Sequence, residues 1–116
     1  MNYEYNGHLL ENDRINLVAN EIISKYSEIN LEQAKKIAML EGKISTEATL
    51  DIKFNRLYNI ILITKDNKEL ARNVYNDLID LLQSNGNDEK INYYAICCDI
   101  ALFFMNEREF PDLNEY

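Results

Sequence analysis

Two adjacent cysteines and a carboxylate are the residues whose types most resemble a reactive site. Cys97, Cys98 and Asp99 lie at the centre of INYYAICCDIALFFMN (91–106), the most apolar stretch of the chain. Neighbouring side chains on a helix point about 100° apart, so a disulfide between these cysteines would require a broken helix. A zinc site needs about four ligands, and a single distant histidine, His8, does not complete the set. We therefore expect two buried free thiols, which pack like small apolar residues.

The same segment is too short to cross a membrane, which requires about 20 apolar residues, and a central aspartate opposes insertion. Asn92, Asp99 and Asn106 are spaced by seven residues and form one narrow polar stripe on a helix. A helix that is apolar on all other sides is expected at the centre of a bundle, or covered by a partner subunit. Asp99 then either faces solvent on this stripe or is buried and paired with Arg56 or Arg72.

A second carboxylate arrangement is formed by Asp77 and Asp80, which share one side of a predicted helix. The pair resembles the Glu-x-x-Asp element of all-helical nucleotide pyrophosphohydrolases, although the upstream Glu-Glu-x-x-Glu of that family is absent. The resemblance implies, as an alternative, a magnesium-dependent nucleotide hydrolase using these two residues. Such a pair is more often a solvated helix face, and no phosphate-cradling glycine loop or triad pattern accompanies it. We expect no catalytic residues, no cofactor and no metal site.

The acidic residues point to a protein partner. The net charge is −8, and residues 1–34, 35–75 and 76–116 contribute −4, +3 and −7. The middle segment can neutralise part of the two ends within the fold, which leaves an acidic surplus near the C-terminus. Such a surface repels nucleic acid and anionic lipid and favours a basic protein. The residues expected to contact this partner are Asp77, Asp80, Asp88, Glu89, Glu107, Glu109, Asp112, Glu115 and Tyr116.

The elements that carry these residues are predicted to be helices. One proline and three glycines in 116 residues leave few breakers, which favours a few long helices over a sandwich or barrel. Apolar residues at three- and four-residue spacing predict a first helix over about 9–28. Asn30 and Gln33 form a capping box that starts a second helix, and Gly42 is suited to end it. The expected buried stripe of the first helix contains Ile15, Val18, Ala19, Ile22, Tyr26 and Ile29.

The third predicted helix starts at Ser45 or Thr46. Its last part, residues 57–64, is apolar nearly all round and could also be a buried strand, but no hairpin turn flanks it, so helix is preferred. Asp66 and Glu69 form a capping box for the fourth helix.

The fourth helix is expected to end with Gly86 in the left-handed position. Asp88 is expected to cap the fifth helix, and Pro111 to stop it.

Together these patterns predict an all-α fold, a compact bundle of about five helices joined by short loops. Residues 1–116 are expected to form one domain, with frayed tails at 1–8 and 110–116. The N-terminus lacks the basic and apolar regions of a signal peptide, so we expect a cytoplasmic protein. Frequent Asn, Ile and Lys are typical of an AT-rich genome and suggest a bacterial or phage source.

The expected function is that of a small acidic protein-binding module. It would inhibit or neutralise a basic, nucleic-acid-acting protein by steric and electrostatic occlusion. In size and charge the chain is similar to immunity proteins, antitoxins and phage anti-defence inhibitors of the anti-CRISPR kind. The alternative is a homo-oligomeric helical scaffold, in which the predicted third and fifth helices of one chain cover those of a two-fold mate.

Overall fold

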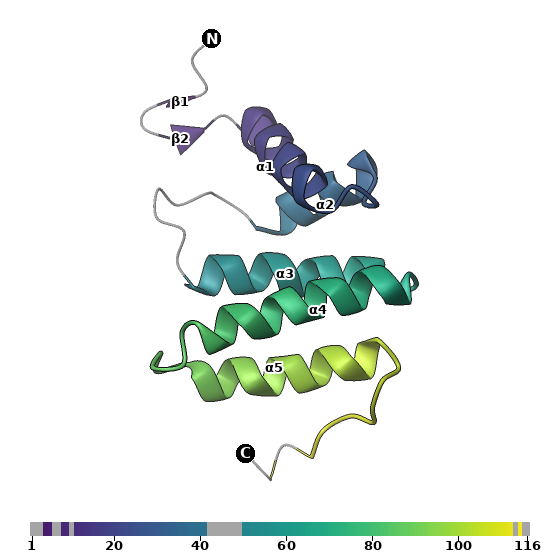
Figure 1. Ribbon diagram of the computed structural model, residues 1–116. Coiled ribbons are helices and arrows are strands. Elements are labelled where there is room, and N and C mark those ends of the chain that lie inside the picture. Colours follow the sequence, from purple (N-terminus) through teal and green to yellow (C-terminus); the bar gives the residue numbers. More distant parts are fainter. Residues whose placement is uncertain (1–3, 6–7, 10, 42–49, 113, 115–116) are drawn as a thin grey trace. The chain divides into compact units, whose positions relative to one another are not determined.

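The computed structural model describes residues 4–5, 8–9, 11–41, 50–112 and 114. Five helices account for most of these residues (Figure 1), so the all-α fold with five helices is confirmed. β1 (Glu4–Tyr5) and β2 (His8–Leu9) add a short antiparallel pairing. The chain divides into two compact units, Met1–Thr49 and Leu50–Tyr116. The expectation of one domain over residues 1–116 stays a prediction.

The first unit contains a helix pair, α1 (Glu11–Lys25) and α2 (Leu31–Leu40). The two helices pack against each other through small and branched side chains, and the predicted capping box is confirmed. Asn30 Oδ1 accepts from the Gln33 amide at 2.8 Å, and Gln33 Oε1 accepts from the Asn30 amide at 3.2 Å. These bonds satisfy amides that the first turn of a helix leaves without partners. The buried residues of this core are Val18, Ala19, Ile22, Tyr26, Ile29, Ala34, Ile37 and Ala38.

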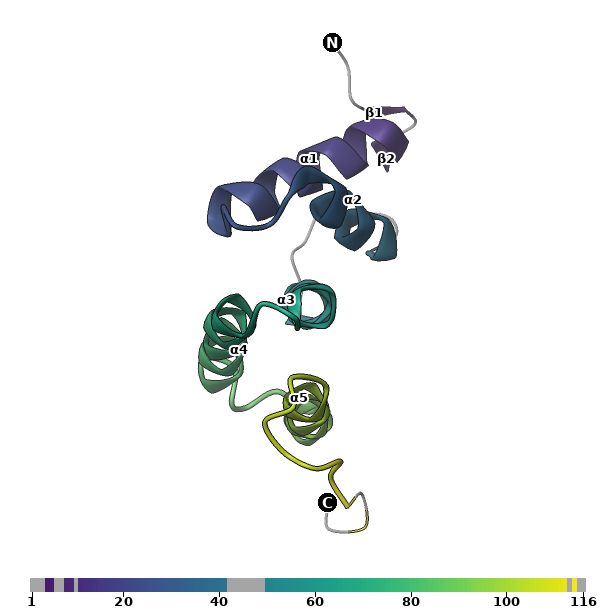
Figure 2. The ribbon, with the colours of Figure 1, turned by 90° about the vertical axis from the view of Figure 1, so that its right-hand side faces the viewer.

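The second unit contains α3 (Leu50–Thr64), α4 (Lys68–Gln83) and α5 (Ile91–Phe104). Residues 57–64 are helical, as preferred from the sequence. Figure 2 shows these three helices nearly end-on, and α5 contacts both α3 and α4. Apolar side chains from all three helices fill the space between them: Phe54, Leu57, Ile60, Ile61, Leu70, Ala71, Val74, Leu78, Leu82, Tyr94, Cys98, Ala101 and Met105.

Several predicted helix ends are wrong by a few residues. Asn67, not Asp66, caps α4, and its side chain accepts from the Leu70 amide at 3.2 Å. At the other end the helix is capped by Ser84 in a right-handed conformation, so the left-handed glycine expected at Gly86 is not used. The Ser84 hydroxyl and the Asn85 amide group donate to the carbonyls of the last turn at 3.0 and 2.7 Å. Side-chain donors therefore bind carbonyl groups of the last turn, whereas in a glycine cap the donors would be backbone amides.

The fifth helix also differs from its prediction at both ends. Asp88 does not cap it but accepts from the Lys90 amide, and Lys90 takes the cap position without a side-chain bond. The helix ends at Phe104 because Asn106 adopts φ 60°, and the Glu107 amide then reaches back to the Leu102 carbonyl at 2.9 Å. This is a Schellman motif built on asparagine, one of the few residues that tolerate the left-handed region. The expected stop at Pro111 therefore comes several residues too late.

The other helices of the second unit do not surround α5 on nearly all sides, and covering of this helix by a partner subunit stays a prediction. Within the described residues α5 buries one face only, formed by Tyr94, Cys98, Ala101 and Met105. Tyr93, Phe103 and Phe104 are 62%, 39% and 38% exposed. A helix this apolar with an open face leaves aromatic surface available for a partner.

The predicted end of the second helix at Gly42 and the predicted start of the third at Ser45 or Thr46 lie outside the described residues. The fraying expected for the two tails stays a prediction. Pro111 is nevertheless buried, and the chain after α5 turns back along that helix (Figure 1).

Candidate partner-binding surface

The N-terminal end of α5 is held by a charged contact with the start of α3. The buried Tyr94 hydroxyl donates to Asp51 Oδ1, and Lys90 Nζ lies 2.9 Å from Asp51 Oδ2. The hydrogen bond from Tyr94 and the one from Lys90 lower the pKa of Asp51 below its ordinary value. Burial, together with the hydrogen bond to Asp51, raises the pKa of Tyr94 above its ordinary value. All three groups are thus satisfied inside the chain, which makes this contact a structural one.

An aromatic cluster continues from this contact into the core. The ring centroids of Phe54 and Tyr94 are 4.5 Å apart, and those of Phe54 and Tyr58 are 5.9 Å apart. The two cysteines are free, as expected, with Cys98 buried and Cys97 half-buried. Burial raises the pKa of Cys98 to about 12 and raises that of Cys97 as well. Since the thiolate is the reactive form, both thiols are poor nucleophiles at neutral pH.

Asp99 has a partner that the sequence analysis did not consider. Its Oδ1 lies 2.9 Å from Arg108 Nη1, and its side chain is 26% exposed. Asp99 is thus half-buried and paired, which lies between the two predictions of an exposed aspartate and a buried, paired one. Arg72, one of the expected partners, instead binds Glu107 at 2.6 and 2.7 Å. Both pairs tie the segment after α5 to the helices that precede it.

That segment, residues 105–112, is called here the C-terminal strap. It starts with the left-handed Asn106, is fixed by the two ion pairs of Glu107 and Arg108, and places Phe110 against Phe103. Their ring centroids are 5.4 Å apart in an edge-to-face arrangement, and Pro111 behind them is buried. The strap therefore holds a defined course along the outer side of α5, rather than extending the helix.

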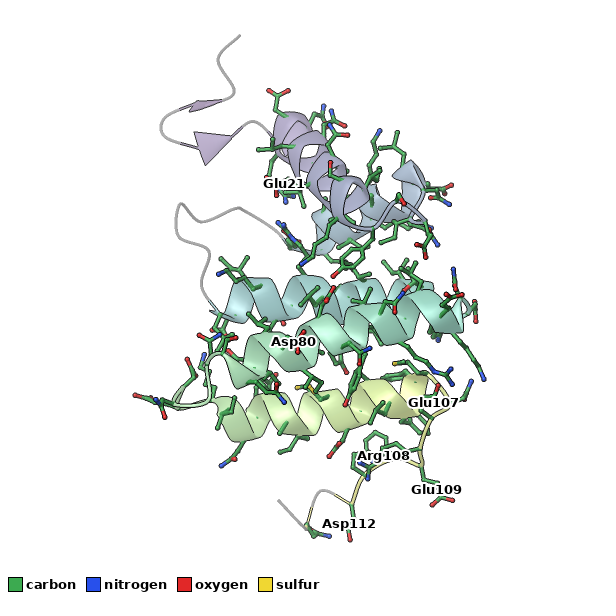
Figure 3. The ribbon with its side chains drawn as sticks, viewed as in Figure 1. Glu21, Asp80, Glu107, Arg108, Glu109 and Asp112 are labelled. Atoms are coloured by element: carbon green, nitrogen blue, oxygen red, sulfur yellow. The ribbon has the colours of Figure 1, made fainter. Side chains whose placement is uncertain are left out.

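The structure divides the predicted partner-binding acids into separate groups. The two on α4 are Asp77, half-buried, and Asp80, exposed; Asp88 and Glu89 lie between α4 and α5. Glu107, Glu109 and Asp112 lie on the strap, and Figure 3 shows the last two directed away from α5. Glu115 and Tyr116 lie outside the described residues.

The two groups that flank α5 are far apart. The helix has 14 residues, and a rise of 1.5 Å per residue separates its ends by roughly 20 Å. Acids that are close in the sequence therefore do not form one continuous patch. Only the strap acids lie next to the exposed phenylalanine rings of α5, and exposed Tyr93 lies at the opposite end of the helix.

Charge pairing divides each group further. Among the described residues, no basic side chain forms an ion pair with Asp80, Glu89, Glu109 or Asp112. Glu107, in contrast, is neutralised by Arg72, while Asp88 and Asp112 each accept from the backbone amide two residues further on without losing their charge. The acids available to attract a basic partner are thus fewer than the sequence predicted.

An exposed aromatic patch lies beside the strap acids and consists of Phe103, Phe104 and Phe110. Neighbouring rings are 5.5 and 5.4 Å apart, and Phe110 is 52% exposed. Next to it is an open hollow of about 320 Å³, lined by Lys65, Asp66, Phe103, Phe104 and Asn106. From the sequence, Phe103 and Phe104 were expected in the interior because the whole helix was expected to be buried, and Phe110 was expected in a frayed tail.

A buried arginine on α1 was also missed. Arg14 is 1% exposed, and its Nη1 donates to the Ala38 carbonyl at 2.8 Å. This carbonyl lies in the last turn of α2, where the helix dipole favours a positive charge. Arg14 therefore stabilises the α1–α2 pair and is not available to a ligand.

The described part of the chain contains no cluster of three or more His, Cys, Asp or Glu side chains that could hold a metal ion. A search of the same residues finds no helix with the length and apolar character that crossing a membrane requires. No family model matches the sequence, and no significant match is found among curated proteins or solved structures.

Proposed function

We propose that the protein is a small acidic binding module that occludes a basic, nucleic-acid-acting protein. The observation that carries the proposal is the pairing of unneutralised acids with exposed aromatic rings on the C-terminal strap and α5. Glu109 and Asp112 have no ion pair among the described residues, and Phe110 between them is 52% exposed. Interfaces are enriched in aromatic side chains, and complementary charge accelerates association.

The mechanism is steric and electrostatic. A net charge of −8 steers the module toward a positively charged surface, which on such a partner normally holds nucleic acid. Once bound, the module covers that surface and repels the phosphate backbone. No bond is made or broken, so the activity requires no catalytic residue.

The proposal is tested by capture with a matched variant. The tagged protein and its Glu109→Lys/Asp112→Lys variant are each incubated with lysate of the native host, washed at low and high salt, and the retained proteins are identified by mass. We expect a basic protein that wild type retains at low salt, releases at high salt, and that the variant does not retain. The purified partner should then lose its binding to nucleic acid when wild type is added.

Two results would contradict this function. One is equal retention of every captured protein by wild type and variant. The other is a captured partner that still binds nucleic acid in the complex.

The exposed aromatic patch also favours a second candidate, a homo-oligomer in which α5 of one chain covers α5 of another. Light scattering distinguishes the two candidates, because a strict monomer at high concentration removes the second. The magnesium-dependent hydrolase gains no further ligand from the described residues around Asp77 and Asp80. It is tested by assaying nucleoside triphosphates with Mg²⁺.

A further inference from the structure

The aromatic patch joins exposed side chains from α5 and from the strap. Phe103 and Phe104 are neighbours on α5, and Phe110 is brought to Phe103 by the strap, so three rings from two segments form one surface. The three rings are between 38% and 52% exposed. Contiguous exposed aromatic surface of this kind marks interaction sites more often than isolated exposed residues do.

The hollow beside the patch already accommodates a cation next to an aromatic ring. Lys65 Nζ lies 5.8 Å from the centroid of the Phe104 ring, within the range of cation–π attraction. The hollow has a volume of about 320 Å³, at the lower end of the range for ligand pockets. It is therefore large enough for one or two side chains of a partner.

The charges around the patch have an acidic surplus. Asp66 lines the hollow, Glu109 precedes Phe110 and Asp112 follows it closely, and none of the three is ion-paired among the described residues. Lys65, which also lines the hollow, offsets one of these three charges, and the nearby Arg108 is paired with Asp99. A ligand that touches the phenylalanines will thus have unneutralised carboxylates on more than one side.

We propose that the aromatic patch binds a basic segment of a protein in which lysine or arginine residues flank an apolar side chain. The apolar side chain packs on the Phe110 ring and enters the adjoining hollow against Phe103 and Phe104. The flanking cations face Asp66, Glu109 and Asp112. The inference rests on the proposed function and specifies the chemistry of the partner and the place where it binds.

Charge selects this occupant over two others. A second copy of the chain would bring a second set of strap carboxylates to the same place, and like charges in close contact oppose association. A membrane with anionic lipids would be repelled in the same way. Only a basic partner gains from both the rings and the acids.

The test uses synthetic peptides as probes. One is a helical peptide of about fourteen residues, four turns, with leucines at three- and four-residue spacing and lysines elsewhere. Its matched control has serine in place of each leucine and the same charge. Titration calorimetry with the full chain should show the leucine peptide binding at least about tenfold tighter, the size expected for burying an apolar side chain. NMR shifts should be concentrated in the strap and the C-terminal end of α5.

Two matched variants locate the site. Phe110→Ser should abolish the tenfold preference for the leucine peptide, whereas Tyr93→Ser, an exposed aromatic residue on the same helix but outside the patch, should keep it. Both side chains are more than half exposed, so neither variant is expected to unfold the protein. Equal affinity of the two peptides for wild type, or equal behaviour of the two variants, would overturn the inference.

The failure of the inference is distinguishable from failure of the proposed function. If the two peptides bind equally but Glu109→Lys/Asp112→Lys abolishes binding of both, the acids act without the patch. The inference is then wrong, and the proposed function stands. If this variant binds both peptides as wild type does, both are wrong. A wild-type dimer that Phe110→Ser dissociates would assign the patch to a second copy and would also overturn the inference.

Discussion

The two ends of α5 use charge and aromatic rings in opposite ways. At the N-terminal end Asp51 accepts from Tyr94 and Lys90, and the Tyr94 ring packs on Phe54 in the core. At the C-terminal end the rings face outward, as the 52% exposure of Phe110 shows. Of the acids at this end, Glu107 and Asp99 are paired with arginines, whereas Glu109 and Asp112 form no ion pair among the described residues.

This difference separates charge that stabilises the fold from charge that is available to a partner. Both ends are acidic in the sequence, and composition alone does not distinguish them. The contacts show that Asp51 is already held by a tyrosine and a lysine and gains little from a further cation, while Glu89 at the same end forms no ion pair among the described residues. We therefore propose that the binding surface lies at the strap, where Glu109 and Asp112 adjoin three neighbouring phenylalanine rings, rather than at the α4–α5 connection, where exposed Tyr93 has no second exposed ring beside it in the described part of the chain.

The largest expected difference between the two ends is in stability. Tyr94→Ala should lower the free energy of unfolding by about 3–5 kcal/mol, because it removes a buried aromatic side chain and leaves a cavity. Phe110→Ala should cost less than about 1 kcal/mol, since the ring is half exposed. Urea denaturation of both variants measures the contrast. Equal losses would mean that the strap is as much a part of the core as Tyr94.

The next effect concerns the Tyr94–Asp51 hydrogen bond and its pH dependence. Tyr94→Phe should cost about 1–2 kcal/mol near neutral pH, because it removes one donor to a charged acceptor. The pKa of Asp51 is below its ordinary value of 3.8. The contribution of ionised Asp51 to the free energy of unfolding is therefore fully present above that pH. The contribution is lost as the pH falls through the lowered folded-state value.

Urea denaturation of wild type and Tyr94→Phe from neutral pH down to about pH 3 follows this loss. The difference between the two proteins should narrow toward the acid end. A difference that stays constant over the whole range would show that the hydroxyl does not act through ionised Asp51.

A smaller effect is expected from the anchor of the strap. Arg108→Ala removes the pair with Asp99, and exposed pairs of this kind contribute about 0–1 kcal/mol. Its main consequence should be faster amide hydrogen exchange in residues 105–112, measured by NMR. Lys36→Ala, which removes an exposed pair with Glu32 on α2, serves as the control and should leave that exchange unchanged. Unchanged exchange in Arg108→Ala would show that other contacts hold the strap.

The smallest effect on stability is expected from the acids themselves. Glu109→Lys and Glu89→Lys should each change the free energy of unfolding by less than about 0.5 kcal/mol, because both side chains are exposed and form no ion pair among the described residues. Thermal unfolding of the two variants checks this. A large loss for Glu109→Lys would assign that residue to the fold rather than to a partner.

Much of the fold could be predicted from the sequence because the signals are local. The stripe from Val18 to Ile29 and the Asn30 capping box depend only on residues within a few turns, and both are confirmed. The end of α5 could not be predicted, because Pro111 is the stronger stop signal in the sequence. The left-handed Asn106 acts earlier, and asparagine adopts that conformation only in some contexts.

The candidate site was harder to predict because it depends on contacts between distant segments. Asp99 and Arg108 are nine residues apart, a spacing that no helix brings together, and they meet only because the chain reverses at Asn106. The sequence does not distinguish Arg14 from an exposed helix residue. Its burial follows only from its contact with the end of α2. The acidic excess near the C-terminus is visible in the sequence, but the neutralisation of Glu107 by Arg72 and the separation of the other acids by the length of α5 required the structure.

The measurement that tests the central claim most directly is the association rate of the captured basic partner with two single variants, Glu109→Lys and Glu89→Lys, at low salt. The substitutions change the net charge equally and differ only in the end of α5 at which they lie. We expect Glu109→Lys to slow association about tenfold and Glu89→Lys to slow it much less, with the difference vanishing at high salt. Equal slowing by both variants would show that net charge alone attracts the partner and would contradict a binding surface at the strap.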